Sequence, residues 1–123
     1  MNTIEKNNIG DLLKYEGQNL YSREEILVEK GQKLECGTIV GRVAETELIK
    51  QLNPDALDGT NIAIGILLKD VDATQNDTKS VMIVREAIVA KSAVIWPKDI
   101  AIEKKKEAVL DLYNHGIVIR KEA

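Results

Sequence analysis

The fold is decided by residues 58–72, which read Asp58-Gly-Thr-Asn-Ile-Ala-Ile-Gly-Ile-Leu-Leu-Lys-Asp-Val-Asp72. This is the longest apolar run of the chain, and turn residues stand at both of its ends. Successive side chains of a strand point to opposite faces. One face carries Ile62, Ile64, Ile66 and Leu68, and the other carries Ala63, Gly65 and Leu67. We therefore predict a buried strand, in which Gly65 indicates a bulge or the close approach of another backbone segment.

The composition of the whole chain favours the same kind of structure. The chain has 123 residues, which is the length of one domain, and 44% of them are hydrophobic. Only 3% are aromatic and there is no phenylalanine, so the core must be built from Ile, Val, Leu and Ala. β-Branched residues favour sheet, and glycine turns separate several short apolar stretches. Strands are expected at 21–28, 38–43, 80–85, 87–90, 93–97 and 117–120, while residues 45–52 fit either a helical turn or a weak strand.

One helix is predicted near the C-terminus. Asp99 can cap its start, and Asn114-His115-Gly116 ends it. Glycine suits the left-handed position after a helix, and histidine suits the negative end of the helix dipole. The apolar residues expected to share its buried face are Ile102, Val109, Leu112 and Tyr113. The expected fold class is therefore mostly β with one short C-terminal helix.

Residues 1–20 differ from the rest because they show no clean periodicity and are interrupted by Asn7-Asn8, Gly10 and Gly17. We interpret them as a flexible N-terminal arm ahead of a folded domain at 21–123. A disordered linker without a binding role would be poorer in apolar residues than this segment. Its apolar positions are Ile4, Ile9, Leu12, Leu13, Tyr15 and Leu20. They require a covering surface, which belongs either to another protein or to the chain's own domain.

The charges and the single cysteine limit the kinds of partner and compartment that we expect for this protein. The net charge is −3 and Lys and Glu are mixed along the chain, so we expect no broad basic field and no nucleic-acid partner. No signal-peptide pattern and no run of about 18 apolar residues is present. We therefore expect that the protein does not associate with a membrane and that it is synthesised in a reducing cytoplasm. Cys36 has no second cysteine with which to form an internal disulfide, and we expect it to be a half-buried apolar residue.

No catalytic, cofactor or metal site is predicted. Residues 70–76 resemble the start of a calcium loop, but the sixth position is Gln75 instead of Gly and the twelfth is Val81 instead of Glu. His115 is the only histidine, so a metal cage built from histidines cannot be assembled. We therefore expect that the protein is not an enzyme.

The turn and strand signals follow one another in a recognisable order. They are Tyr21-Ser-Arg-Glu24, Gly31 with Leu34, Gly37-Thr-Ile-Val-Gly41, Asp58-Gly59, Ala63-Ile-Gly-Ile-Leu-Leu68 with Asp70-Val-Asp-Ala73, Val84-Arg85, Trp96-Pro97 and a terminal Gly116-Ile117 strand. In number and spacing this order resembles the head decoration proteins of lambda-like tailed phages, over residues 21–120. The resemblance lies in the set as a whole, because each signal alone is an ordinary turn or strand.

The resemblance implies a small β-tulip-like domain that forms a homotrimer. It implies that the trimer sits on the three-fold sites of the expanded capsid, on the outside of the virion, after synthesis in the host bacterial cytoplasm. There it would cement neighbouring subunits of the major capsid protein and stabilise the head against internal DNA pressure. The segment before the domain would be the capsid-binding arm, so deletion of residues 2–16 is expected to leave a folded trimer that no longer coats heads.

A hammerhead-type carrier or binding module is the alternative. Residues 29–41 have the turn rhythm of biotinyl and lipoyl modules. Such a carrier presents an exposed lysine at the tip of a hairpin. Lys69 and Lys79 flank a polar loop, but they lack the neighbouring methionine that such tips usually show. The mass in solution separates the two interpretations, because only decoration requires a trimer.

Overall fold

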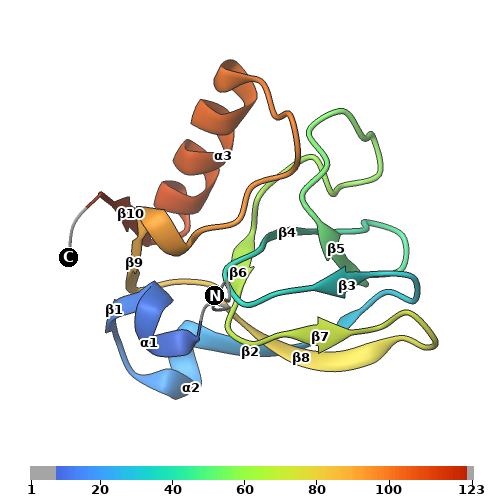
Figure 1. The fold of residues 1–123 in the computed structure, drawn as a ribbon, viewed down its shortest axis with the longest axis horizontal. Coiled ribbons are helices and arrows are strands. Elements are labelled where there is room, and N and C mark those ends of the chain that lie inside the picture. The colour runs from blue at the N-terminus through green and yellow to red at the C-terminus, as the bar shows by residue number, and fades with distance from the viewer. Residues whose placement is uncertain (1–7, 122–123) are drawn as a thin grey trace, which may run out of the picture.

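The computed structural model describes residues 8–121, and its architecture is mostly β (Figure 1). The strands are β1 (Leu13–Glu16), β2 (Arg23–Val28), β3 (Lys33–Leu34), β4 (Ile39–Arg42), β5 (Ile49–Gln51), β6 (Gly65–Leu67), β7 (Val71–Asp72), β8 (Thr78–Ile83), β9 (Ala87–Ala90) and β10 (Ile117–Arg120). The helices are α1 (Ile9–Leu12), α2 (Asn19–Ser22), the 3-10 turn η1 (Lys91–Ala93) and α3 (Ile102–Asn114). The predicted class is confirmed, and β5 shows that residues 45–52 contribute a strand.

The strands form a barrel and a second sheet. The barrel closes in the order β2, β5, β4, β6 and β8. The second sheet has β9 in its centre, antiparallel to β1 and parallel to β10. β3 and β7 form a separate antiparallel pair. Figure 1 shows α3 at the top of the view and α1 and α2 at the bottom, and residues from both ends of the chain meet in the second sheet.

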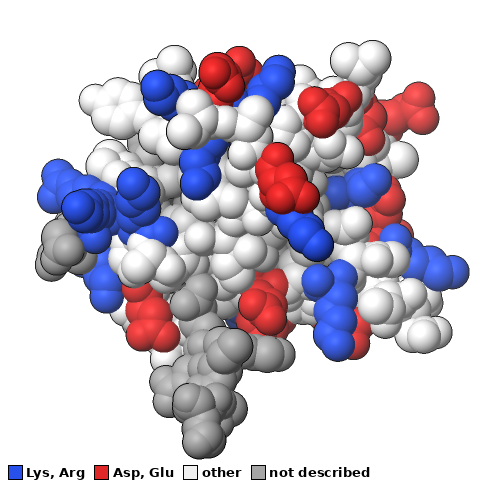
Figure 2. Space-filling model, turned by 45° about the horizontal axis from the view of Figure 1, so that its top comes forward, with Lys and Arg blue, Asp and Glu red and all other residues white. Residues whose placement is uncertain are grey.

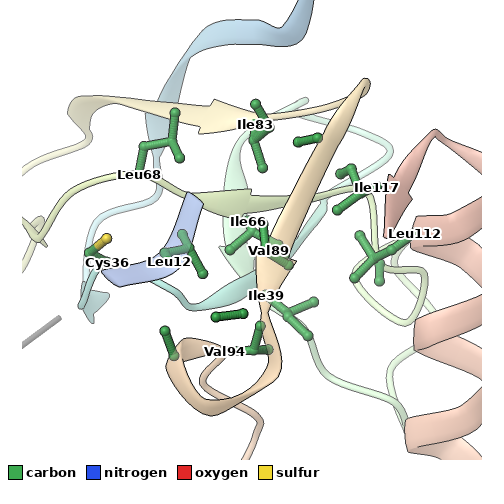
Figure 3. Packing of buried hydrophobic residues seen from close by; sticks show 14 of the residues in the cluster. Leu12, Cys36, Ile39, Ile66, Leu68, Ile83, Val89, Val94, Leu112 and Ile117 are labelled. Carbon is green, nitrogen blue, oxygen red and sulfur yellow. The ribbon is translucent and has the colours of Figure 1, made fainter. Parts of the chain in front are cut away.

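The apolar residues divide into two clusters, because neighbouring residues of β4, β6 and β8 point to opposite sides of the barrel wall. The cluster inside the barrel includes Val40, Leu67 and Met82. The outer cluster includes Ile39, Ile66 and Ile83. Figure 3 shows that α1, β9 and α3 complete this outer cluster with Leu12, Val89 and Leu112. The wall is therefore covered on both faces, as predicted.

The central strand is shorter than predicted, since β6 covers only Gly65–Leu67. Before it the chain turns instead, because Asp58 Oδ1 accepts hydrogen bonds from the backbone N–H and the hydroxyl of Thr60 at 3.0 and 2.6 Å. Ile62 is consequently exposed, and Ile64 packs on the cluster inside the barrel. The predicted common face of these isoleucines with Ile66 is therefore wrong.

The close approach predicted at Gly65 is confirmed. A Cβ at this position would lie 2.7 Å from the carbonyl oxygen of Ile83 and 2.8 Å from the sulfur of Met82. Both neighbours belong to β8, which pairs with β6 in the barrel. The two strands therefore meet in the space that any other residue would fill with a side chain.

Two predictions about the region before α3 are wrong. Residues 93–97 form no strand, because η1 is followed by an extended segment that pairs with Thr38 only through an isolated bridge at Ile95. Asp99 does not cap the helix, which begins after Ala101. Instead Asp99 adopts a left-handed φ of 59° in the turn that precedes the helix.

The end of α3 agrees with the prediction, but its packing does not. Nδ1 of His115 lies 2.8 Å from the carbonyl oxygen of Asp111, and Gly116 follows with a φ of +88°. The helix buries Ala108 and Leu112. It exposes Ile102, Val109 and Tyr113, which the periodicity places on the buried face. The domain therefore covers only a narrow side of α3, and much of the apolar surface of the helix faces outward.

Candidate functional site

Residues 8–17 are folded onto the domain. α1 begins with a reciprocal cap, in which Asn8 Oδ1 accepts from the N–H of Asp11 at 3.0 Å and Asp11 Oδ2 accepts from the N–H of Asn8 at 3.1 Å. Leu12 then enters the outer cluster. β1 pairs with β9, and beyond it Gly17 N–H donates to the carbonyl oxygen of Glu86 at 2.8 Å. This segment is therefore positioned by both apolar packing and backbone pairing.

The six apolar residues predicted for the arm separate into groups. Ile4 lies outside the described residues. Leu12 is fully buried, and Leu13 is partly buried against the outer cluster. The exposed members are Ile9, Tyr15 and Leu20. Leu20 is the extreme case, because 95% of its surface is exposed. The structure thus joins Leu12 and Leu13 to the core and leaves the other three described residues on the surface.

A polar clamp holds the end of this segment. The carboxylate of Glu16 accepts hydrogen bonds from Arg23 Nε and Nη2 at 2.6 and 2.7 Å, and from the hydroxyl of Ser22 at 2.6 Å. The Arg23 hydrogen bond is the main reason that the pKa of the Glu16 carboxyl lies below its ordinary value. This bidentate pair, the Glu16–Arg23 clamp, ties β1 to the first residue of β2.

The clamp encloses a short turn that presents apolar side chains to solvent. α2 carries both Leu20 and Tyr21, and Tyr21 is also exposed. The guanidinium carbon of Arg85 lies 4.7 Å from the centre of the Tyr21 ring, and Arg85 Nη1 donates to the carbonyl oxygen of Tyr21. The turn is therefore held at both ends and from the side. We call Ile9, Tyr15, Leu20 and Tyr21 the N-terminal apolar group.

Substituting Glu16 by glutamine is expected to lower the free energy of unfolding by about 1.5–3 kcal/mol at neutral pH, because hydrogen bonds to a charged group are lost. The folded-state pKa of Glu16 is depressed, so the stabilisation is fully present above the ordinary glutamate pKa of about 4.3. It is lost as the pH falls through the lower folded-state pKa. We therefore expect urea unfolding between pH 3 and 8 to give a lower free energy of unfolding for Glu16→Gln than for the wild type. The difference should shrink only toward the acid end of this range.

Glu24→Gln is the matched control for this experiment. Glu24 accepts one hydrogen bond from Arg42 Nη2 at 2.7 Å, and both side chains are more exposed than those of the Glu16–Arg23 clamp. An exposed pair contributes about 0–1 kcal/mol, so its removal should change stability little at any pH. Equal losses from the two substitutions would contradict a special role for the clamp.

The acidic residues of the loop at 70–77 serve local structure. Asp72 Oδ1 accepts from the backbone N–H and the hydroxyl of Thr74, while Asp77 Oδ1 accepts from the N–H of Lys30 at 2.8 Å. Within residues 8–121, no three His, Cys, Asp or Glu side chains are placed to hold a metal ion. In the same part of the chain, no helix is long and apolar enough to cross a membrane.

The comparison with known protein families covers almost the whole chain. Residues 2–117 match the family described as bacteriophage lambda head decoration protein D. The chain belongs to this family. A search of curated proteins finds no match. As a head decoration protein it binds the phage capsid, and its place is in the virion.

The family assignment also bears on the alternative function. The match of the head decoration family includes the N-terminal segment as well as the domain, so it begins 19 residues before the predicted resemblance at 21–120 and ends three residues before it. The carrier alternative required an exposed lysine at a hairpin tip. Lys79 instead lies within β8, where it pairs with Leu27 of β2. Decoration is thus the function that the family supports, and the family is a structural one.

Sequence reasoning missed two parts of this region. The predicted boundary at residue 20 places Tyr21 in the domain, but Tyr21 shares α2 with Leu20. The Glu16–Arg23 clamp was also missed, because the two residues are separated by a glycine and a helical turn that bring them together only in the folded chain.

Cys36 is almost fully buried instead of half-buried, and burial is the main cause that raises the pKa of its thiol to about 11.

Proposed function

We propose that this head decoration protein binds the outside of the expanded phage capsid as a homotrimer. It occupies the three-fold sites, cements neighbouring subunits of the major capsid protein and so stabilises the head against internal DNA pressure. The protein is made in the host bacterial cytoplasm and joins the head there. The observation that supports this proposal most directly is the exposed pair on α2, which the Glu16–Arg23 clamp and Arg85 hold in place.

The proposed capsid-binding element is the arm at residues 1–20. Within it, Leu12 and Leu13 join the segment to the domain, while Ile9, Tyr15 and Leu20 are free to meet another surface. Tyr21 extends this set by one residue. Apolar side chains on a rigid turn bind with a smaller loss of conformational freedom than those on a flexible chain. We therefore assign capsid contact to the N-terminal apolar group together with Ile4.

Three copies of this element strengthen binding. Each buried leucine or isoleucine contributes about 1.5–3 kcal/mol, which is modest for a single segment that must also become ordered. A trimer on a three-fold site presents three such segments to three equivalent capsid positions. After the first segment binds, the others bind at a high effective concentration, so the trimer remains attached.

Leu20→Ser is the variant that tests the proposed contact. It is expected to weaken cosedimentation with purified undecorated heads at least about tenfold. A tenfold loss corresponds to about 1.4 kcal/mol for the whole trimer, and this is less than about 0.5 kcal/mol for each of its three leucines. Leu57→Ser is the matched control, since Leu57 is a leucine that is 99% exposed on the loop between β5 and β6. Wild-type binding by Leu20→Ser would contradict the proposal, as would an equal loss in both variants.

A short truncation complements the point variants. Deletion of residues 2–16 would also remove Leu12 and β1, so a loss of binding after it would not separate contact from folding. Deletion of residues 2–7 removes Ile4 and leaves α1, β1 and the Glu16–Arg23 clamp in place. We expect the shorter deletion to reduce head binding while the thermal unfolding of the domain stays unchanged.

A further inference from the structure

The outward side of α3 carries an apolar surface that its own domain leaves uncovered. Ile102 is 65% exposed, Leu110 58% and Tyr113 62%, and Val109 is exposed as well. We call these four residues the α3 stripe. Ile102, Val109 and Tyr113 lie near one line along the helix, since residues seven and eleven apart nearly eclipse at 3.6 residues per turn. Leu110 widens the line on one side.

The α3 stripe is presented by a well-anchored helix. On its inner side, Ala108 and Leu112 join the outer cluster, and the helix packs chiefly on β10. The ammonium group of Lys105 also lies 5.1 Å from the centre of the Trp96 ring. The stripe and the buried side therefore point in different directions, and binding at the stripe would not disturb the packing of the domain.

We propose that the α3 stripe is the surface through which this chain contacts a second copy of itself in the trimer. The inference rests on the proposed homotrimer and adds the interface that builds it. The stripe brings four exposed apolar side chains together on one side of a helix, and the largest apolar patch on a typical monomer is often functional. A stable contact buries about 800 Å² per partner, so the stripe supplies the apolar core and the polar residues around it supply the rim.

The charges beside the α3 stripe favour a copy of the same chain as the occupant. Lys106 lies within the stripe, four residues after Ile102 and four before Leu110, and Glu103 stands three residues before Lys106 on the same side of the helix. The stripe's side of α3 therefore carries one positive and one negative side chain. A surface with balanced charges can meet itself without repulsion, and at a three-fold axis different sides of the two helices face each other. In Figure 2 both signs are interspersed over most of the face shown, with a group of positive side chains at its left edge.

The position of α3 supports the same assignment. Figure 1 shows α3 at the opposite end of the view from α1 and α2, which carry most of the N-terminal apolar group. If that group meets the capsid, the α3 stripe remains as a second, separate apolar surface for another partner. A homotrimer requires such a surface on every subunit. The two surfaces can then be occupied at the same time.

Size-exclusion chromatography with light scattering tests the proposal on the full chain. Wild-type protein should elute as a trimer of about 41 kDa, three times the 13.7 kDa chain. Tyr113→Lys and Ile102→Lys, at the two ends of the α3 stripe, should each shift the protein to the monomer at micromolar concentration, with at least a tenfold weaker association. Leu57→Lys, which places the same charge on another exposed residue, should stay trimeric.

The outcomes separate this inference from the proposed function. A trimeric wild type with trimeric stripe variants would overturn the interface and leave the trimer standing. Stripe variants that stay trimeric and no longer cosediment with heads would overturn it too, because the stripe would then face the capsid. A wild type that is monomeric would overturn the trimer and the interface together. Thermal unfolding of each variant shows whether it is folded. If one of the two stripe variants does not fold, the other still tests the interface.

Discussion

Gly65→Val is expected to prevent folding, so that the variant accumulates as insoluble protein or unfolds well below the wild-type temperature. The Cβ that every other residue carries would stand 2.7 Å from the backbone carbonyl oxygen of Ile83. A backbone oxygen in a paired strand cannot move aside without opening the contact between β6 and β8. Because these strands close the barrel, we expect a loss of more than about 4 kcal/mol, which is exceptional for one substitution.

A pair of alanine variants identifies the cause. Gly31 has a φ of +102° and no neighbour within 4 Å of a Cβ, so Gly31→Ala introduces backbone strain without a collision. That strain costs about 1–2 kcal/mol. Gly65→Ala introduces the collision alone and should be the more damaging of the two in urea unfolding. If Gly65→Ala were the milder variant, or if Gly65→Val were soluble and as stable as wild type, the close approach would be wrong.

The parts of the fold that could be predicted from sequence are those controlled by a few neighbouring residues. Gly31 and Gly37 have the positive φ expected of turns, and His115-Gly116 ends α3 as predicted. At these positions the backbone conformation itself excludes most side chains. The order of short strands follows from the same turns. Local chemistry therefore sufficed for the secondary structure class and for the bounds of β9 and β10 and the end of α3.

The predictions that failed rested on apolar periodicity alone, and contacts that periodicity does not reveal decided the structure there. The apolar run at 62–64 has the pattern of a strand, but hydrogen bonds around Asp58 and Thr60 make a turn there instead. The apolar face of α3 was assigned to the core, although the space beneath the helix accepts only Ala108 and Leu112. Periodicity shows which residues share a face of an element. It does not show whether that face meets the same domain or another molecule.

The candidate site shows the same division. The sequence predicts that the apolar residues at the N-terminus need a covering surface, and the domain itself covers Leu12 and part of Leu13. Sequence alone could not decide which surface covers each one, because that depends on the pairing of β1 with β9 and on the Glu16–Arg23 clamp. Once these contacts are known, Leu12 and Leu20 have different surroundings despite their identical chemistry.

Leu12→Ala is expected to destabilise the domain by about 2–5 kcal/mol, the usual cost of emptying a fully buried leucine site. For a chain of this length, each kcal/mol corresponds to about 4 °C in Tm, so the melting temperature should fall by roughly 8–20 °C. An open surface pocket of about 430 Å³ lies beside α1 and is lined in part by Ile9, Cys36 and Leu68. Leu12 does not line this pocket and is fully buried, so its removal leaves a new space inside the outer cluster.

Leu20→Ala makes the same chemical change on the surface and should leave the free energy of unfolding within about 0.5 kcal/mol of the wild-type value, which corresponds to about 2 °C in Tm. The thiol of Cys36 provides a second measurement, since it is buried next to Leu12 in the outer cluster and is the only cysteine in the chain. Its labelling by a maleimide should be faster in Leu12→Ala and unchanged in Leu20→Ala. A Leu12→Ala protein that melts like wild type but binds heads weakly would place Leu12 in the capsid contact, and the folded N-terminal segment described above would then be wrong for the free protein.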